Sequence, residues 1–376
     1  MNQEKQRWGY TTGTCAQAAT KAAIWMLLAG ERKEQVTVEL PKGRELTLDI
    51  RDMQVGYAKD GGRLLSWVSC AVQKDSGDDP DITNGVLVYS RVEKVDKSGI
   101  TLEGGRGIGK VIKPGLEQQV GEAAINRVPR QMIVREVKEV CEEVGYTAGI
   151  CVEISIPGGE KLAQKTFNPR LGIEGGLSIL GTSGMVEPMS EKALLDTIRL
   201  EMQVKIANGR KFLVVTPGNY GLAFLKKEYG IREKEIVKCS NYIGETIDMA
   251  AKLGCQGMVL AGHVGKLVKV AGGIMNTHSK WADCRMEILA AAALRAGLDG
   301  KRARTLLDCV TTDDALEKCT QEERRRIMGE IMNKMEDYLT YRAAGKLQIG
   351  AVVFSNVYGI LGKTGQADAL MQRQGR

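Results

Sequence analysis

The sequence predicts a two-part protein: a mainly antiparallel α+β domain at residues 1–189, and a parallel, doubly wound α/β domain with a helical C-terminal part at residues 190–376. Three observations support this. Segments that alternate apolar and polar residues dominate the first half. From about residue 190, helices alternate with short apolar strands. A length of 376 residues also suits two domains better than one.

The first half begins with a helix and continues mostly in strands. Residues 16–28 are rich in alanine and predict a helix, with Thr11, Thr12 and Thr14 as candidate N-caps. The expected strands are residues 36–40, 45–50, 64–72, 86–95, 100–102 and 150–156. The first two strands flank Pro41-Lys-Gly-Arg44 and predict a hairpin. Pro129 suits the first turn of a helix that ends near Val144.

The second half alternates helices with short strands. Residues 191–208 predict an amphipathic helix, and the expected strands are residues 212–216, 236–239 and 258–261. Each strand ends in a glycine-bearing loop before a helix, which is typical of a parallel, doubly wound sheet. Such sheets bind ligands at the carboxyl ends of their strands.

The C-terminal part is predicted to be mainly helical. Thr320-Gln-Glu-Glu323 has the spacing of a capping box and predicts the start of a long helix. A last strand is expected at residues 350–355, followed by a loop at residues 359–365. The segment 347–365 could return to the first sheet or join the second, and the sequence leaves both open.

Composition excludes several classes of protein. The 45 glycines come with only 8 prolines and no G-X-Y period, which excludes collagen. A net charge of +7 without a Lys/Arg block argues against nucleic acid as a partner and suits an anionic small molecule. Nine scattered cysteines without a CxxC spacing favour reduced thiols. The longest apolar stretch, residues 22–30, is too short for a membrane span, so we expect a cytoplasmic protein without a membrane partner.

Glycine-rich segments predict where a ligand binds. Thr11-Thr-Gly-Thr14 places hydroxyls at a helix start, which suits a carboxylate or phosphate, and an ordinary N-cap is the alternative. Residues 172–184 contain five glycines but neither a P-loop nor a G-x-G-x-x-G motif, which disfavours classical ATP and NAD sites. The strand-end loops 216–219, 239–241 and 262–266 suit a nucleotide-like ligand, and plain turns are the alternative.

Both histidines lie in predicted polar loops and are candidate catalytic residues, although a structural role is the more common one. His263 belongs to a strand-end loop, and His278 precedes a predicted helix. No histidines or cysteines have the spacing of metal ligands, so no metal site is expected. Four arginines are candidates for gripping a carboxylate: Arg106, Arg127, Arg130 and Arg170.

Several long motifs resemble a known family. They are Gly-Tyr-Thr-Thr-Gly-Thr-Cys at 9–15, Phe-Asn-Pro-Arg-Leu-Gly-Ile at 167–173, Gly-Gly-Leu-Ser-Ile-Leu-Gly-Thr-Ser-Gly at 175–184, Val-Glu-Pro-Met-Ser at 186–190, Gly-His-Val-Gly-Lys-Leu-Val-Lys at 262–269 and Asn-Thr-His-Ser at 276–279. In this order, across residues 7–365, they resemble the cobalt-precorrin-5B C1-methyltransferases of anaerobic cobalamin biosynthesis.

The resemblance implies that S-adenosyl-L-methionine (SAM) methylates C1 of a corrinoid substrate that carries the cobalt. It also implies an α+β domain followed by a Rossmann-like domain. We expect SAM on the strand-end loops, at Pro217, Gly218, Asn219, Ser240, Asn241, Gly244, Gly262 and Gly265. We expect the corrinoid at Thr11, Thr12, Gly13, Thr14, Arg170, Gly181, Thr182, Lys266, Asn276 and Arg285. His263 and His278 are candidates for a proton acceptor or an axial contact to cobalt.

Other functions stay open on the residues alone. A small-metabolite kinase would also use glycine loops and a positive cleft, and a corrinoid carrier would bind the macrocycle without chemistry. A nucleic-acid module is the weakest alternative. A homo-oligomer is neither predicted nor excluded.

Overall fold

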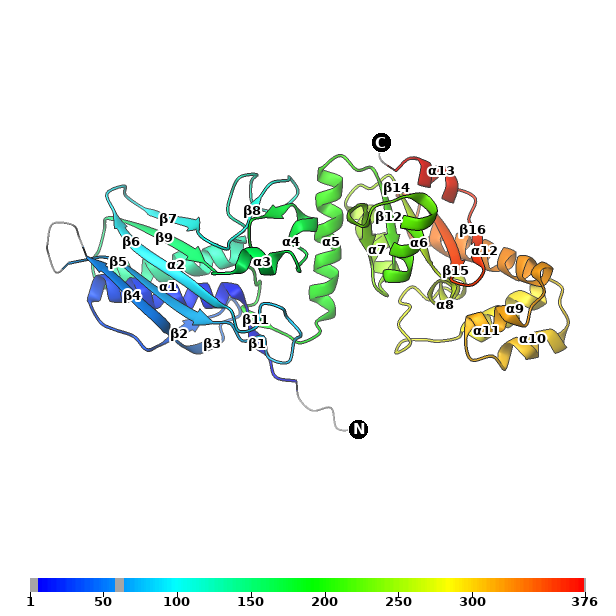
Figure 1. Cartoon of the computed structure of the whole chain (residues 1–376), viewed down its shortest axis with the longest axis horizontal. Helices are drawn as coiled ribbons and strands as arrows, with labels where there is room; N and C mark the ends of the chain where they lie inside the picture. Colours follow the sequence, from blue (N-terminus) through cyan, green and yellow to red (C-terminus); the bar gives the residue numbers. More distant parts are fainter. Residues whose placement is uncertain (1–5, 58–63, 375–376) are drawn as a thin grey trace. The chain divides into compact units, whose positions relative to one another are not determined.

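The computed structural model describes residues 6–57 and 64–374, which form two compact units, Met1–Glu191 and Lys192–Arg376 (Figure 1). Each unit has its own hydrophobic core and its own five-stranded sheet. The chain is thus a mixed α/β protein with one mainly antiparallel and one mainly parallel sheet, as the sequence predicts.

The first unit is built on the sheet β4-β5-β6-β9-β7, in which only β7 and β9 are parallel. Its strands are β4 (Arg51–Tyr57), β5 (Leu65–Gln73), β6 (Leu87–Val95), β7 (Ile100–Gly104) and β9 (Gly149–Ser155). Two long helices, α1 (Thr12–Ala29) and α2 (Arg127–Glu143), pack together, and α1 lies against β5 and β6 (Figure 1).

Alternation along the strands explains this packing. Val68, Cys70 and Val72 of β5 are buried under the helices, together with Val88 and Val92 of β6. Small alanines let α1 approach the sheet closely, and almost every side chain of the helix is buried. Thr11 is its N-cap, and Gly30, in the left-handed conformation, ends it.

Short elements complete the first unit. The predicted hairpin is confirmed as β2 (Gln35–Glu39) paired with β3 (Glu45–Asp49). Two further antiparallel pairs are β1 (Gly9–Tyr10) with β11 (Met185–Val186), and β8 (Lys110–Val111) with β10 (Ile173–Glu174). The short helices are α3 (Gly159–Ala163) and α4 (Asn168–Leu171).

The second unit contains the sheet β13-β12-β14-β15-β16. Its strands are β12 (Phe212–Thr216), β13 (Ile236–Lys238), β14 (Gly257–His263), β15 (Gln348–Ser355) and β16 (Gly359–Lys363). Strands β13, β12, β14 and β15 are parallel to one another, and β16 is antiparallel to β15. The helices are α5 (Glu191–Ala207), α6 (Asn219–Tyr229), α7 (Ile243–Lys252), α8 (Val264–Leu267), α9 (Arg285–Arg295), α10 (Gly300–Leu307), α11 (Thr312–Glu317), α12 (Gln321–Ala343) and α13 (Ala367–Gln372), with 3-10 turns η1 (Glu233–Glu235) and η2 (Val268–Gly272).

Both faces of the four parallel strands are covered, which explains why these strands are mainly apolar. Leu213 and Val215 of β12 face a core that includes α5, α7, α9 and α12. Val214, between them, faces a smaller core with α6 and α13. The capping box at Thr320 is confirmed at the start of α12.

Two sequence predictions for the second unit are wrong. Residues 359–365 are not a loop, because residues 359–363 form the edge strand β16, whose glycines at 359 and 362 conceal the strand pattern. Gly262 and His263 are not loop residues either: they belong to β14, and Val264 already begins α8. The segment 347–365, left open by the sequence, lies in the second unit's sheet.

Candidate functional site

The strand order of the second unit indicates where a ligand would be expected to bind. The chain runs from β12 outward to β13 and then crosses back to β14 on the other side of β12. The order therefore reverses between β12 and β14, and parallel sheets bind ligands at the carboxyl ends of strands at such a reversal. The residues that follow these two strands are Pro217–Asn219 and Val264–Lys266.

At the end of β12, Gly218 leaves open space. It is the N-cap of α6, and its backbone is extended, a conformation that any residue can adopt. A Cβ added to Gly218 would meet no atom within 4 Å. Gly221, one turn later, differs, because an added Cβ would lie 1.7 Å from the Thr216 hydroxyl. Gly218 is thus a glycine that packing within the protein does not require.

At the end of β14, His263 serves as the N-cap of α8. Its Nδ1 accepts a hydrogen bond of 3.1 Å from the Gly265 backbone N–H, so the neutral ring carries its proton on Nε2. Nε2 lies 3.6 Å from Oδ2 of Asp313, and the Tyr220 ring lies 6.0 Å from the imidazole, centroid to centroid. Burial lowers the pKa of His263, and Asp313 opposes that shift. As a proton acceptor, His263 would need this arrangement to change, and its catalytic role stays a prediction.

At the end of β13, Asn241 organises the neighbouring loops. Its side-chain oxygen accepts hydrogen bonds from Lys266 Nζ at 2.7 Å and from the Thr277 hydroxyl at 3.2 Å. Ser240, just before it, has a φ of +53°, an unusual conformation for a residue with a side chain. Burial lowers the pKa of Lys266. Lys266 is half-buried, and this half-buried cation suits an anionic ligand group.

The segment that follows η2 is fixed by Lys269. This lysine is buried, and its Nζ donates to the carbonyls of Thr277 and Ala282. Asn276 accepts from the His278 backbone N–H, and Arg285 donates to Asp283 at 2.9 Å. His278 itself is exposed, and its Nδ1 accepts from the Lys280 N–H.

The remaining predicted cofactor residues pack within the second unit. A Cβ on Gly262 would lie 2.9 Å from Leu267 and 3.2 Å from Pro217, and one on Gly244 would lie 2.8 Å from Met275. A Cβ on Gly265 would lie 3.3 Å from His263 Nδ1. These glycines allow close contacts between loops, and whether they also touch a cofactor stays a prediction.

In the first unit, the threonines at the start of α1 bind the glycine-rich loop. Thr14 donates to the Gly184 carbonyl at 2.7 Å, and the Thr12 hydroxyl accepts from the Leu180 N–H at 3.0 Å. Gly13 donates its backbone N–H to the Leu180 carbonyl, and Thr11 donates its own to the Gly184 carbonyl. All three threonines are buried. The hydroxyls of Thr12 and Thr14 thus join α1 to the glycine-rich loop, whereas the Thr11 hydroxyl bonds Thr14. The proposed contact of these threonines with a substrate stays a prediction.

Two further predicted substrate residues of this unit, Arg170 and Thr182, are more accessible. Arg170 is half-buried at the end of α4, and Thr182 is exposed in the loop that covers the start of α1. Their roles also stay predictions.

A substitution at Gly181 would show how much the close contact between this loop and α1 contributes to stability. Its φ is +136°, and an added Cβ would lie 2.2 Å from the Thr11 hydroxyl. We expect Gly181→Ala to destabilise the protein by about 2–3 kcal/mol, from the strained backbone and the clash together. Gly175 is the matched control, because its φ is +83° but its Cβ would meet nothing within 4 Å. Thermal denaturation that shows equal losses for Gly181→Ala and Gly175→Ala would contradict the predicted clash.

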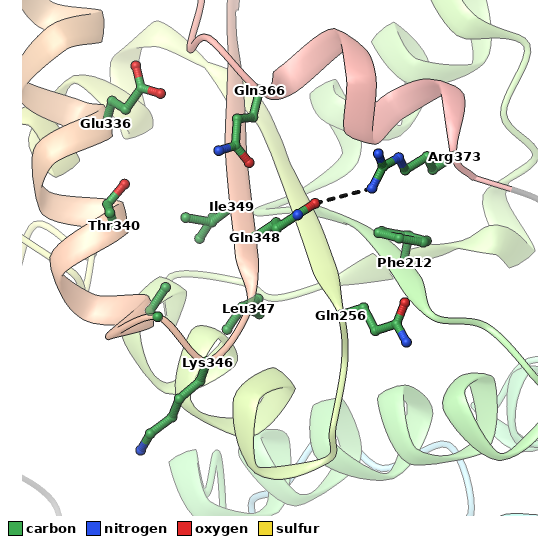
Figure 2. Close-up of a pocket in the computed structure, with 12 residues that line it drawn as sticks. Phe212, Gln256, Glu336, Thr340, Lys346, Leu347, Gln348, Ile349, Gln366 and Arg373 are labelled. Atoms are coloured by element: carbon green, nitrogen blue, oxygen red, sulfur yellow. Dashed lines mark hydrogen bonds between the residues drawn. The ribbon is translucent and has the colours of Figure 1, made fainter.

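A cavity among the described residues lies at the opposite end of the parallel strands of the second sheet. It has a volume of about 530 Å³ and is lined by residues at the amino ends of the strands, including Phe212, Gln256 and Gln348. Figure 2 shows the hydrogen bond that Arg373 donates to Gln348, with Phe212 nearby. The strand reversal favours the carboxyl ends of the strands over this cavity as the ligand site.

The structure also brings together residues that no sequence motif marks. Asp313 of α11 accepts a hydrogen bond of 2.9 Å from the Ser355 hydroxyl at the end of β15, next to His263 at the end of β14. His263 lies 50 positions before Asp313 in the sequence, and Ser355 lies 42 positions after it. The parallel pairing of β14 with β15 brings the ends of the two strands together. No spacing rule predicts such a cluster.

The fold and these strand ends define the class: a two-unit α/β protein whose parallel sheet carries a candidate small-molecule site. Comparison with known proteins then identifies the family. The family model described as CbiD matches residues 1–188, and the one described as CbiD, C-terminal domain, matches residues 276–365.

Relatives match over nearly the whole chain. A cobalt-precorrin-5B C(1)-methyltransferase of Ruminiclostridium cellulolyticum is 48% identical, over 95% of this chain and 91% of its own. One of Thermoanaerobacter sp. is 46% identical, over 96% of each. A crystal structure of the cobalamin biosynthesis protein CbiD from Archaeoglobus fulgidus is 29% identical, over 74% of this chain and 83% of that one, with a TM-score of 0.39. The chain belongs to the CbiD family, as the sequence motifs indicate.

Proposed function

We propose that this protein is a C-methyltransferase that uses SAM to methylate C1 of cobalt-precorrin-5B in cobalamin biosynthesis. The observation that carries the proposal is the 48% identity, over 95% of the chain, to a relative named for that reaction. The cobalt arrives within the substrate, so it belongs to the substrate and not to a resident metal site.

The parallel sheet supports a place for SAM. We assign the second unit to the Rossmann-like class because four parallel strands are covered by helices on both faces and the strand order reverses at β12 and β14. The donor would lie at the carboxyl ends of these strands, over Gly218. Open space at this glycine would let a ligand approach the backbone closely.

Methyl transfer from SAM requires few catalytic side chains. The nucleophilic carbon of the substrate forms a bond to the methyl carbon while the S–CH3 bond breaks and its electron pair stays on sulfur. Such an in-line displacement needs the two reactants to be held in near-attack geometry, and it needs no covalent nucleophile. Rigid strand ends, stabilised by the hydrogen bonds of Asn241 and His263, provide suitable supports for this positioning.

The acidic side chains of a corrinoid precursor need cationic partners, and Lys266 is the strongest candidate. It is half-buried and held by Asn241. We expect Lys266→Gln, which keeps a donor for Asn241, to raise the KM for the corrinoid about tenfold while kcat changes less. Lys301→Gln is the control, since Lys301 is exposed on α10. Steady-state kinetics that show the same KM for Lys266→Gln and the wild type would remove Lys266 from the substrate site.

The free cysteines are consistent with a protein that resides in a reducing compartment. All nine are free, and six of them are buried. We therefore propose the cytoplasm as the location. Among residues 6–57 and 64–374, no helix has the length and apolar character that a membrane span requires.

The reaction itself tests the proposal. Purified protein is incubated with methyl-labelled SAM and cobalt-precorrin-5B, and the products are analysed by mass spectrometry. We expect S-adenosylhomocysteine and a macrocycle that carries one additional labelled methyl group. Binding of the macrocycle without methyl transfer would instead support a corrinoid carrier. In a separate incubation with Mg-ATP, transfer of a phosphoryl group to a small molecule with release of ADP would support a kinase.

A further inference from the structure

Asp313 is a carboxylate fixed at the strand ends of the second unit. Its Oδ1 accepts from the hydroxyl of Ser355, the last residue of β15, at 2.9 Å. Its Oδ2 lies 3.6 Å from Nε2 of His263, the last residue of β14. Because Nδ1 of His263 accepts from Gly265, the proton of the neutral ring lies on Nε2 and faces Asp313. The Ser355 hydroxyl thus bonds one oxygen of this carboxylate, and the imidazole of His263 lies beside the other.

Among the described residues, no lysine or arginine forms an ion pair with Asp313. In the part of the chain that the structure describes, its one ion-pair contact is with His263, whose pKa is lowered by burial, so the imidazole is neutral near pH 7. The neighbouring Asp314 differs, because Lys318 lies 3.5 Å from it and the Val310 N–H donates to it. The Asp313 side chain is also 41% exposed, so a ligand can reach it.

The surroundings suit a cationic group. The ring of Tyr220, which is 67% exposed, lies 6.0 Å from the imidazole of His263, and Tyr220 follows Gly218 by two positions. A carboxylate and an exposed aromatic ring both attract a positive charge. Acidic side chains in the first turn often stabilise a helix, and Asp314 is available for this role in α11. The Asp313 carboxylate instead contacts the ends of two strands.

We infer that the Asp313 carboxylate, positioned by His263 and Ser355, binds a positively charged group of the methyl donor. This inference rests on the proposed function, which makes a sulfonium compound the ligand of this sheet edge. The donor has two such groups, the sulfonium and the α-ammonium. In this account His263 and Ser355 are positioning residues that act through Asp313.

Calorimetric titration of the full chain with SAM and with S-adenosylhomocysteine tests the inference, because the second compound lacks the sulfonium charge and keeps the ammonium. We expect Asp313→Asn to bind SAM at least about tenfold more weakly. If the group bound is the sulfonium, S-adenosylhomocysteine affinity is unchanged; if it is the ammonium, both affinities fall alike. Glu317→Gln is the control, since Glu317 is exposed on the same helix and the charge change is the same.

The outcomes separate this inference from the function beneath it. Wild-type affinity for SAM in a folded Asp313→Asn variant, verified by its melting temperature, would overturn the role of Asp313 alone. A wild-type protein that binds neither compound would overturn the proposed function and the inference with it. Ser355→Ala provides a second check. Introduced into the wild-type protein, it should weaken SAM binding about threefold, and introduced into the Asp313→Asn variant, it should cause no further loss of affinity. Equal losses in both backgrounds would show that Ser355 does not act through Asp313.

Discussion

Replacement of Gly218 by valine is expected to weaken SAM binding by at least about tenfold, or about 1.4 kcal/mol. The reason is steric: the added side chain would occupy the open space at the carboxyl end of β12, where the donor is proposed to approach the backbone. Gly218→Ala, with only one added carbon, should give a smaller loss. Calorimetric titration with SAM measures both.

The folded protein should tolerate the Gly218 variants. The backbone is extended there, and an added Cβ meets no atom within 4 Å, so the main cost is a poorer N-cap for α6. Gly300→Val is the matched control, because Gly300 also stands at a helix start in the same unit with open space around it. Unchanged SAM affinity in Gly218→Val would remove the donor from this strand end.

Loss of the Glu136 carboxylate should destabilise the protein by about 3–5 kcal/mol, the usual cost when one partner of a buried charged pair is removed. Glu136 lies on α2 and is 1% exposed. Its Oε1 accepts from Gln17 Nε2 of α1 at 2.6 Å, and its Oε2 lies 3.1 Å from Lys21 Nζ. Glu136→Ala would leave the buried Gln17 amide without this acceptor and break the polar link between the two helices. Thermal and urea denaturation followed by circular dichroism measure the loss.

Glu139 provides an internal comparison. It lies one turn further along α2, has a side chain that is 55% exposed, and pairs with Arg135 at 3.7 Å, while Arg135 also lies 3.6 Å from Glu136. Exposed pairs contribute little, so Glu139→Ala should cost less than about 1 kcal/mol. Similar losses for the two variants would show that burial of Glu136 does not determine its contribution.

Elements with a regular apolar pattern could be predicted from the sequence. β12 has the predicted bounds, and α12 begins after the predicted capping box, because burial on both faces and a local side-chain cap leave clear local signals. β4 was missed because most of its side chains are exposed and its pattern is weak. β16 was missed because its glycines resemble a turn, whereas one of them, Gly362, allows Met332 to pack against the strand.

The candidate site could be predicted only in part. Strands that are followed by glycine-containing loops can be recognised in the sequence, so the carboxyl ends of the strands could be predicted as the ligand site. What each glycine does depends on its neighbours in space: Gly218 faces open space, whereas Gly262 contacts Leu267 and Pro217. Asp313 carried no sequence signal, because its partners come from the ends of two strands that pair only in the folded sheet.

A crystal structure of the full chain with S-adenosylhomocysteine would show where the donor binds. We expect the ligand to lie at the carboxyl ends of β12 and β14, against Gly218 and within reach of Asp313. A ligand in the cavity at the other edge of the sheet, beside Phe212, Gln348 and Arg373, would contradict this expectation.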